Sequence, residues 1–275
     1  MIRLGRPDEP TSFATAVAAA HDAIEKLIQA GKNPKDEDFA NKWGAFKHVF
    51  ENAHDRKCAY CESRFGATYP GDVEHYRPKT MVKDAMTRGD RDDTKNQSPE
   101  RTFGKAVKPG YWWLAYVWTN YVLACKRCNS SWKTNQFPLK GTRAKLVEGV
   151  ERQEAPLLLN PYDTDPAPHL SFDEMGNVKG RTSEGKETVD VCGLDRRTLE
   201  IEREVVAQRV LTDIEDYGLA CGQDNMLWQN RCLSRLLEAC HEKVGYAGMA
   251  RQLVAQKLEL SYDELREAEA QGLLT

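Results

Sequence analysis

The sequence predicts an α+β protein that is mostly helical, and three of its features lead to this prediction. Apolar residues recur at helical spacing near the N-terminus and again from residue 195 onward. A Met-Gly pair between two short segments, 169–173 and 177–179, predicts a β-hairpin. Two Cys-x2-Cys pairs between residues 58 and 128 predict a compact module held together by a metal ion.

The 275 residues are expected to form three parts, since a domain usually has about 100–200 residues. Residues 1–57 would be an N-terminal helical scaffold. Residues 58–150 would form the metal-binding module, with an inserted loop at 80–109. Residues 151–275 would supply the β-hairpin and a helical C-terminal extension.

The composition is that of a soluble globular protein, with 29% charged residues and a mean hydropathy of -0.65. No apolar run reaches the roughly 18 residues that a membrane span needs, so no membrane partner is expected. The first ten residues lack the apolar core of a secretory signal, which makes the cytoplasm the expected compartment. In that compartment eight cysteines are expected to be thiols or metal ligands rather than disulfides.

The local patterns predict the elements in chain order. Residues 12–31 and Asp36 to Ala53 are each expected to form one helix. Residues 80–109 are polar and are expected to form a long loop. The segment 130–136 predicts a short helix, residues 157–159 a short strand, and the chain after Asp195 several helices. The tryptophans of the aromatic segment 110–123 are expected to pack in the core, whereas Trp132 is the candidate for exposure.

The charge is unevenly distributed, although the net charge is only -3. Residues 101–147 hold nine Lys and Arg and no Asp or Glu. Such segregation fits a polyanionic partner, and the alternative is a basic segment whose counter-charges come from elsewhere in the fold.

The two cysteine pairs are the most specific motif. Cys58 with Cys61 and Cys125 with Cys128 together offer four thiolates, the usual ligands of tetrahedral zinc. Four sulfur ligands leave no open position, so this Zn²⁺ would be structural. The alternative is a redox dithiol.

A second set of residues flanks these pairs and is suited to phosphodiester hydrolysis. Glu74 and Asn129 are oxygen ligands for a divalent cation, Mg²⁺ or Mn²⁺, and His75 is a candidate base for activating water. Zinc binding would bring both segments together. The bases near the motif are candidates for contacting nucleic acid: Arg77, Lys79, Lys126, Arg127 and Lys133.

The motifs C58-A-Y-C61, V73-E-H75-Y-R-P78-K and N120-Y-V-L-A-C125-K-R-C128-N129 resemble those of the HNH, or ββα-metal, endonucleases. The resemblance covers residues 58–138 and implies a β-hairpin and a helix clamped by the zinc knuckles. It implies that His75 is the general base and that Glu74 and Asn129 bind the catalytic cation. Asn120 would order the loop that carries His75.

Two features depart from the family pattern. The residue before the histidine is usually Asp, whereas here it is Glu74, and Asp72 is close enough to compete with it as the ligand. The His75–Asn120 separation is also long, because of the insertion at 80–109.

Three segments that flank these motifs, residues 110–120, 129–139 and 157–178, are similar to the HNH nuclease subunit of Septu-type and retron-associated anti-phage systems. This similarity implies an ATPase partner protein and a nucleic-acid substrate, DNA in preference to RNA. Two other functions remain open: a zinc-stabilised module that binds nucleic acid without cutting it, and a structural zinc scaffold whose helices bind protein. The His75→Ala variant separates the first of these from a nuclease.

Overall fold

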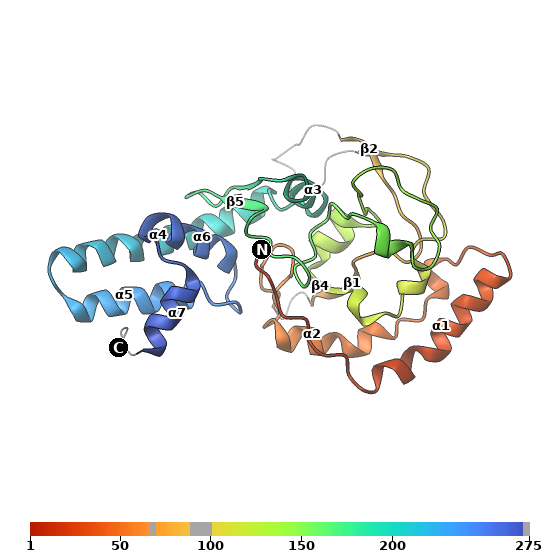
Figure 1. Cartoon of the computed structure of the whole chain (residues 1–275), viewed down its shortest axis with the longest axis horizontal. Helices are drawn as coiled ribbons and strands as arrows, with labels where there is room; N and C mark the ends of the chain where they lie inside the picture. Colours follow the sequence, from red (N-terminus) through yellow and green to blue (C-terminus); the bar gives the residue numbers. More distant parts are fainter. Residues whose placement is uncertain (67–69, 89–100, 272–275) are drawn as a thin grey trace.

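The computed structural model describes residues 1–66, 70–88 and 101–271, with the side chains of 85–88 and 101 excepted. The molecule is elongated (Figure 1). Helices α1 and α2 and strands β1 and β4 lie toward one end, and helices α4 to α7 form the other. The result is a mixed α and β structure with three small two-stranded sheets among the described residues.

The N-terminal part contains the first predicted helix but not the second. Helix α1, Phe13–Gln29, buries Phe13, Val17, Ala20 and Ile24, which is the apolar face that the spacing predicts. The prediction of one helix from Asp36 to Ala53 is wrong. The 3-10 turns η1, Asp36–Asp38, and η2, Trp43–Phe46, precede a short α2, Lys47–Ala53.

The break in this segment has a local cause. The Asn41 side chain accepts a hydrogen bond from the Gly44 backbone N–H at 3.0 Å, and this bond competes with helical pairing. The Tyr116 hydroxyl also donates a hydrogen bond to the Ala40 carbonyl, at 3.1 Å.

The central hairpin joins segments that are far apart in the sequence. Strand β1, Asp72–His75, pairs antiparallel with β4, Tyr121–Ala124, so that Asp72 faces Ala124 and His75 faces Tyr121. A π-helix, η5 (Arg127–Lys133), follows β4 directly. The 3-10 turns η3, Trp112–Leu114, and η4, Trp118–Asn120, carry the aromatic segment into β4.

The inserted segment is not only a loop. Strands β2, Ala85–Arg88, and β3, Arg101–Phe103, pair antiparallel, and an isolated bridge joins Val82 and Val107. The prediction of one long loop over 80–109 is therefore wrong for these residues. Its central part, 89–100, lies outside the described residues.

The predicted hairpin after residue 168 is confirmed. Strand β5, Leu170–Phe172, pairs with β6, Val178–Gly180, around Gly176, whose φ is +76°. In place of the predicted strand at 157–159 there is only an isolated antiparallel bridge between Leu139 and Pro156, with the Leu157 N–H donating to the Pro138 carbonyl at 2.9 Å. Beyond it the Leu159 backbone N–H donates to Thr188 Oγ1 at 2.8 Å. The turn η6, Val150–Gln153, precedes it.

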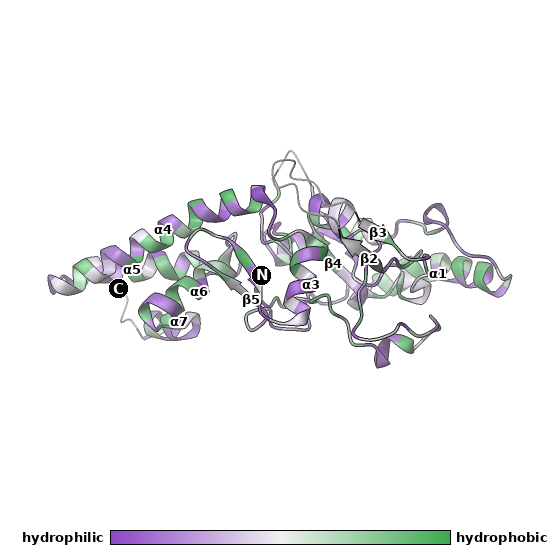
Figure 2. Ribbon diagram, turned by 90° about the horizontal axis from the view of Figure 1, so that it is seen from above, coloured by the Kyte–Doolittle hydropathy of each residue, from purple (hydrophilic) through white to green (hydrophobic). Residues whose placement is uncertain are grey.

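The C-terminal helices are confirmed as a group, although the first begins before Asp195. Apolar and polar residues alternate along them (Figure 2), as expected for helices that bury one face. Helices α4 and α5 form a long antiparallel pair. The helices are α3, Ser183–Cys192; α4, Arg197–Gly222; α5, Met226–Ala239; α6, Ala247–Leu258; and α7, Tyr262–Ala270.

Within the described chain, every helix is too short or too polar to cross a lipid bilayer. The division at residues 57 and 150 stays a prediction.

Candidate functional site

The four predicted cysteines come together at one point. The four sulfur atoms all lie within 4.8 Å of one another, and those of Cys61 and Cys125 are 3.8 Å apart. The four residues are Cys58, Cys61, Cys125 and Cys128. Zinc bonded to four sulfurs at about 2.3 Å requires sulfur–sulfur distances of about 3.8 Å. The cluster therefore fits a tetrahedral zinc ion, with no position left for water.

Local backbone geometry builds each knuckle. In the first knuckle Glu62 adopts a φ of +64°, which turns the chain so that the Cys58 N–H reaches the Ser63 carbonyl at 3.0 Å. The Ala59 N–H donates to the Leu123 carbonyl of β4 at 2.9 Å. The first knuckle is thus tied to the strand that leads into the second.

A buried arginine accompanies the sulfurs. Arg196 Nη1 lies 3.5 Å from the Cys128 sulfur and donates to the Gly193 carbonyl at 2.8 Å. Burial lowers the pKa of Arg196, but the sulfurs of Cys128, Cys61 and Cys125 outweigh burial and raise it overall. Four thiolates around Zn²⁺ carry a net charge of -2, so Arg196 offsets part of the charge of a loaded site. Arg196 is not identifiable as part of the site from the sequence alone, because it lies 68 positions from Cys128.

His75 is held in an aromatic setting at the end of β1. Its Nε2 lies 2.9 Å from the Ala115 carbonyl, and its ring meets those of Trp43 and Tyr121 edge to face, at centroid distances of 4.5 and 5.3 Å. Burial lowers the pKa of His75 to about 3, and the nearby charges of Lys79 and Lys133 add to the effect. The imidazole is therefore neutral at pH 7.

Asn120 ties together the two segments that hold His75. Its Oδ1 accepts from the Arg77 N–H at 2.8 Å, and its Nδ2 donates to the carbonyls of Arg77 and Leu114, each at 3.1 Å. Arg77 follows β1 in the chain, and Leu114 is the residue before Ala115, whose carbonyl accepts the hydrogen bond from His75. This arrangement supports the expectation that Asn120 orders the loop around His75.

Glu74 points to the opposite side of β1 from His75, since adjacent residues of a strand alternate between its faces. Its Oε1 accepts from Lys133 Nζ at 2.5 Å, and the same ammonium donates to the His75 carbonyl at 3.1 Å. The Lys133 side chain is fully buried and that of Glu74 is 10% exposed. Lys133 was expected to contact a phosphate, whereas here it neutralises Glu74.

Asp72 shares a face of β1 with Glu74 and lies nearer the knuckles. Asn129 Nδ2 is 3.5 Å from Asp72 Oδ2, and both residues are half-buried. The structure thus brings Asn129 to Asp72 rather than to Glu74. A divalent cation held by Glu74 and Asn129 does not fit this arrangement, because the ammonium of Lys133 already contacts the Glu74 carboxylate.

The predicted nucleic-acid contacts divide into two groups. Arg77 pairs with Glu154 and lies over the Phe137 ring, and Lys79 pairs with Asp36 at 3.4 Å. The ion pairs of Arg77 and Lys133 are buried, whereas that of Lys79 lies at the surface, since the Asp36 side chain is 69% exposed. Lys126 and Arg127 are both exposed.

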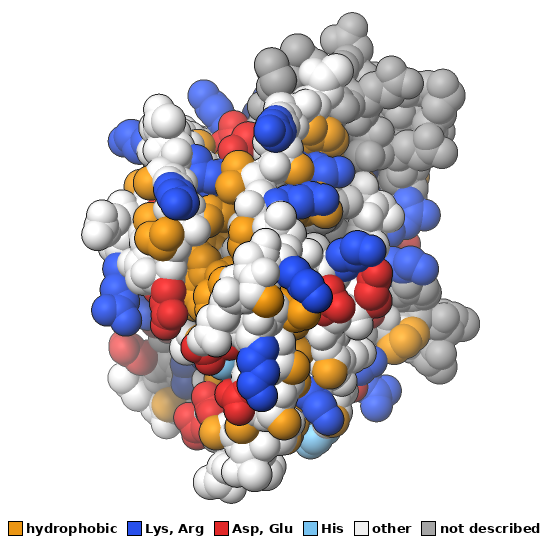
Figure 3. Space-filling model, turned by 90° about the vertical axis from the view of Figure 1, so that its right-hand side faces the viewer, with side chains coloured by type: hydrophobic (Ala, Val, Ile, Leu, Met, Phe, Trp, Pro, Cys, Tyr) orange, Lys and Arg blue, Asp and Glu red, His pale blue; other side chains and the backbone are white. Residues whose placement is uncertain are grey.

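Lys126 and Arg127 line a cavity of ≈ 1160 Å³ between the second knuckle and α4, together with Arg64 and Arg196. The basic stretch is partly neutralised by acids from other segments, as when Arg143 pairs with Asp84 at 2.7 Å. On the end of the molecule that carries α1 and β2, Lys and Arg side chains lie among Asp and Glu (Figure 3).

The tryptophans largely serve the core. Trp113 and Trp118 are buried, as expected, and Trp118 packs on Phe50 with ring centroids 4.6 Å apart. The prediction that Trp132 is exposed is wrong, since it is 2% exposed. Gly193 ends α3 with a φ of +58° and lies so close to the Trp132 indole that a Cβ there would be 2.1 Å from the ring.

This chain is similar in sequence to known proteins. The Septu protein PtuB of Bacillus mycoides (strain KBAB4) is 34% identical to this chain over 221 residues, which are 76% of this chain and 68% of that protein. The Septu protein PtuA of the same strain is 28% identical over 145 residues, 52% of this chain and 18% of PtuA. No protein-family model matches the chain, and no solved structure matches it. The extent of the first match shows that the chain belongs to the family of the Septu protein PtuB.

Proposed function

We propose that this protein is a metal-dependent HNH endonuclease that hydrolyses the phosphodiester bonds of nucleic acid, DNA in preference to RNA, within an anti-phage defence system. The observation that carries the proposal is the setting of His75, a buried neutral imidazole held by a backbone carbonyl at the end of a two-stranded hairpin. The adjoining four-cysteine cluster supports the proposal, because zinc there would hold the hairpin to η5.

The hydrogen bond of His75 assigns a role to each of its ring nitrogens. A carbonyl oxygen only accepts, so the Nε2 that faces Ala115 carries the proton. Nδ1 of the neutral ring then keeps a lone pair and is the atom that would take a proton from water. Tyr121 donates its hydroxyl to the same Ala115 carbonyl at 2.8 Å, which fixes the position of this acceptor.

A bound Mg²⁺ or Mn²⁺ would neutralise the charge that grows on the phosphate and on the leaving oxygen. The chain itself contributes the acceptor nitrogen of His75, the clamp made by Asn120 and the exposed charges of Lys126 and Arg127. Exposed Lys and Arg near a scissile position attract the polyanion and make its binding sensitive to salt.

The defence role is proposed from the relatives, whose names place them in Septu systems. We further propose that an ATPase partner controls the nuclease, as the resemblance of the flanking segments implies. A cytoplasmic location follows from the same proposal.

Cleavage with a matched histidine control tests the proposal. Wild type, His75→Ala and His48→Ala are incubated with plasmid, single-stranded DNA and tRNA in Mg²⁺, Mn²⁺ or chelator, alone and with the partner. His48 is exposed on α2 and is the control. We expect cleavage by wild type and His48→Ala, and none by His75→Ala or with chelator. If all three proteins bind DNA and none cuts it, the protein is a non-catalytic nucleic-acid-binding module.

That alternative has its own support in the basic cavity beside the second knuckle. It predicts that Lys126→Ala and Arg127→Ala weaken DNA binding, while folded His75→Ala binds DNA as wild type does.

A further inference from the structure

We propose that Asp72, rather than Glu74, is the carboxylate that holds the divalent cation together with Asn129, and that Glu74 is the internal counter-ion of Lys133. The inference deepens the proposed function, since it names the carboxylate that would hold the proposed cation, on the face of β1 opposite to the His75 side chain. It is tested by metal binding, which does not depend on whether the protein cuts nucleic acid.

The carboxylate of Glu74 is already in use. It is 2.5 Å from the Lys133 ammonium, whose side chain is fully buried and so has no solvent to replace this partner. A divalent cation at Glu74 would lie beside that ammonium, and like charges at such a distance repel strongly where water is excluded. The same ammonium also donates to the His75 carbonyl, at 3.1 Å, so two acceptors fix its position.

Asp72 is two residues earlier on the same face of β1 and lies in a different environment. It is half-buried, so water can fill the remaining positions of a hard cation. Its contact is with the amide of Asn129 at 3.5 Å, and no ion pair to Asp72 is present in the described part of the chain. A half-turn of the amide about its final side-chain bond places Oδ1 where Nδ2 now lies. Asp72 and Asn129 would then present two oxygens to one cation.

The hairpin register and the π-helix explain why these two residues meet. Asp72 faces Ala124, the residue before Cys125, so the second knuckle turns the chain back over Asp72. In η5 the Thr134 N–H donates to the Asn129 carbonyl at 2.7 Å, a five-residue spacing that widens the helix. Asn129 and Lys133 consequently both reach β1, one at Asp72 and the other at Glu74.

The test compares two conservative substitutions on one strand. Mn²⁺ binding to the zinc-loaded full chain is measured by electron paramagnetic resonance for wild type, Asp72→Asn and Glu74→Gln. We expect one Mn²⁺ per chain in wild type, at least tenfold weaker binding in Asp72→Asn, and an affinity within about threefold of wild type in Glu74→Gln. Weakened binding in folded Glu74→Gln with unchanged binding in Asp72→Asn overturns the proposal, as does a wild type without a Mn²⁺ site.

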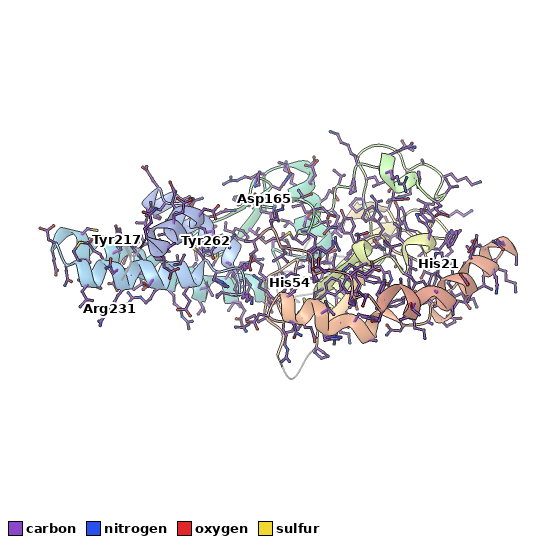
Figure 4. The ribbon with its side chains drawn as sticks, turned by 60° about the horizontal axis from the view of Figure 1, so that its bottom comes forward. His21, His54, Asp165, Tyr217, Arg231 and Tyr262 are labelled. Atoms are coloured by element: carbon purple, nitrogen blue, oxygen red, sulfur yellow. The ribbon has the colours of Figure 1, made fainter. Side chains whose placement is uncertain are left out.

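A background site has to be removed first. His21, Asp22 and Glu25 on α1 also bring possible ligand atoms within 4.8 Å of one another, and Figure 4 shows His21 on this helix. All binding measurements are therefore made in a Glu25→Gln background. The four-cysteine site is kept saturated with zinc, which thiolates prefer to Mn²⁺.

Glu74→Gln leaves the buried ammonium of Lys133 without its carboxylate, so the variant could unfold. The double variant Glu74→Gln/Lys133→Gln removes both charges and is expected to bind Mn²⁺ as wild type does. A double variant that is folded and no longer binds Mn²⁺ overturns the proposal.

If Asp72→Asn loses Mn²⁺ while wild type never cuts nucleic acid, the nuclease proposal fails and the cation site stands. If wild type cuts nucleic acid and Asp72→Asn binds Mn²⁺ as wild type does, the cation-site proposal fails and the nuclease proposal stands.

Discussion

Replacing Lys133 by Met tests how strongly the buried ion pair supports the site. Met retains the length of the side chain but removes the ammonium that contacts Glu74 Oε1 at 2.5 Å and the His75 carbonyl at 3.1 Å. Breaking a buried ion pair by removing one partner costs about 3–5 kcal/mol, because the remaining charge is left without compensation. Glu74 keeps 10% of its side chain exposed, so we expect about 3 kcal/mol. In a protein of this size that loss corresponds to a fall of roughly 6–12 °C in Tm.

The assay is thermal unfolding of zinc-loaded protein at pH 7, followed by circular dichroism. The control is the double variant Glu74→Gln/Lys133→Met, which removes both charges and is expected to recover most of the lost stability. If Lys133→Met unfolds within 2 °C of wild type, Glu74 is hydrated or paired elsewhere, and our account of its environment is wrong.

Three further predictions concern the zinc cluster and its surroundings. Cys61→Ser is expected to purify with less than one zinc per chain by elemental analysis, whereas Cys192→Ala, a buried cysteine outside the cluster, retains it. Arg196→Met should weaken zinc binding about 10–100-fold in competition with a chelator, and Arg197→Met, an exposed neighbour, should not. Burial, assisted by the charge of Lys57, lowers the pKa of His54 to about 4 from its usual 6.5. The unfolded state therefore binds one more proton between these pH values, and stability falls as the pH drops from 6.5 to 4. His54→Phe should flatten this fall by up to about 1.4 kcal/mol per pH unit in urea unfolding, and an unchanged slope would contradict the assignment.

Several features could be predicted from the sequence because they are local or depend on spacing alone. The two Cys-x2-Cys pairs are recognised from their spacing alone, and four thiolates are the usual ligand set of tetrahedral zinc. Helix α1 and the β5–β6 hairpin follow from apolar periodicity and a turn glycine, so both were predicted close to their observed bounds. The clamp by Asn120 was reached through the family resemblance, and its hydrogen bonds agree with that expectation.

Other features were decided by contacts between distant segments. The helix expected over Asp36 to Ala53 breaks because Asn41 and Tyr116 take backbone groups that the helix needs. The strand expected at 157–159 is reduced to an isolated bridge between Leu139 and Pro156, and the Leu159 N–H donates to Thr188 of α3 instead of to a neighbouring strand. Periodicity cannot report either event, because Tyr116 and Thr188 come from other parts of the chain, and because the Asn41 side chain competes for a backbone N–H of its own segment.

By itself the sequence determined which residues could do chemistry: four cysteines, a Glu-His pair and an asparagine next to a knuckle. Only the tertiary structure decided how the charged groups are paired. It placed Lys133 against Glu74, Asn129 against Asp72 and Arg196 against the cysteine cluster. The physical reason is that a buried charge needs a partner within a few ångströms, and the fold supplies each partner from a segment far away in the sequence.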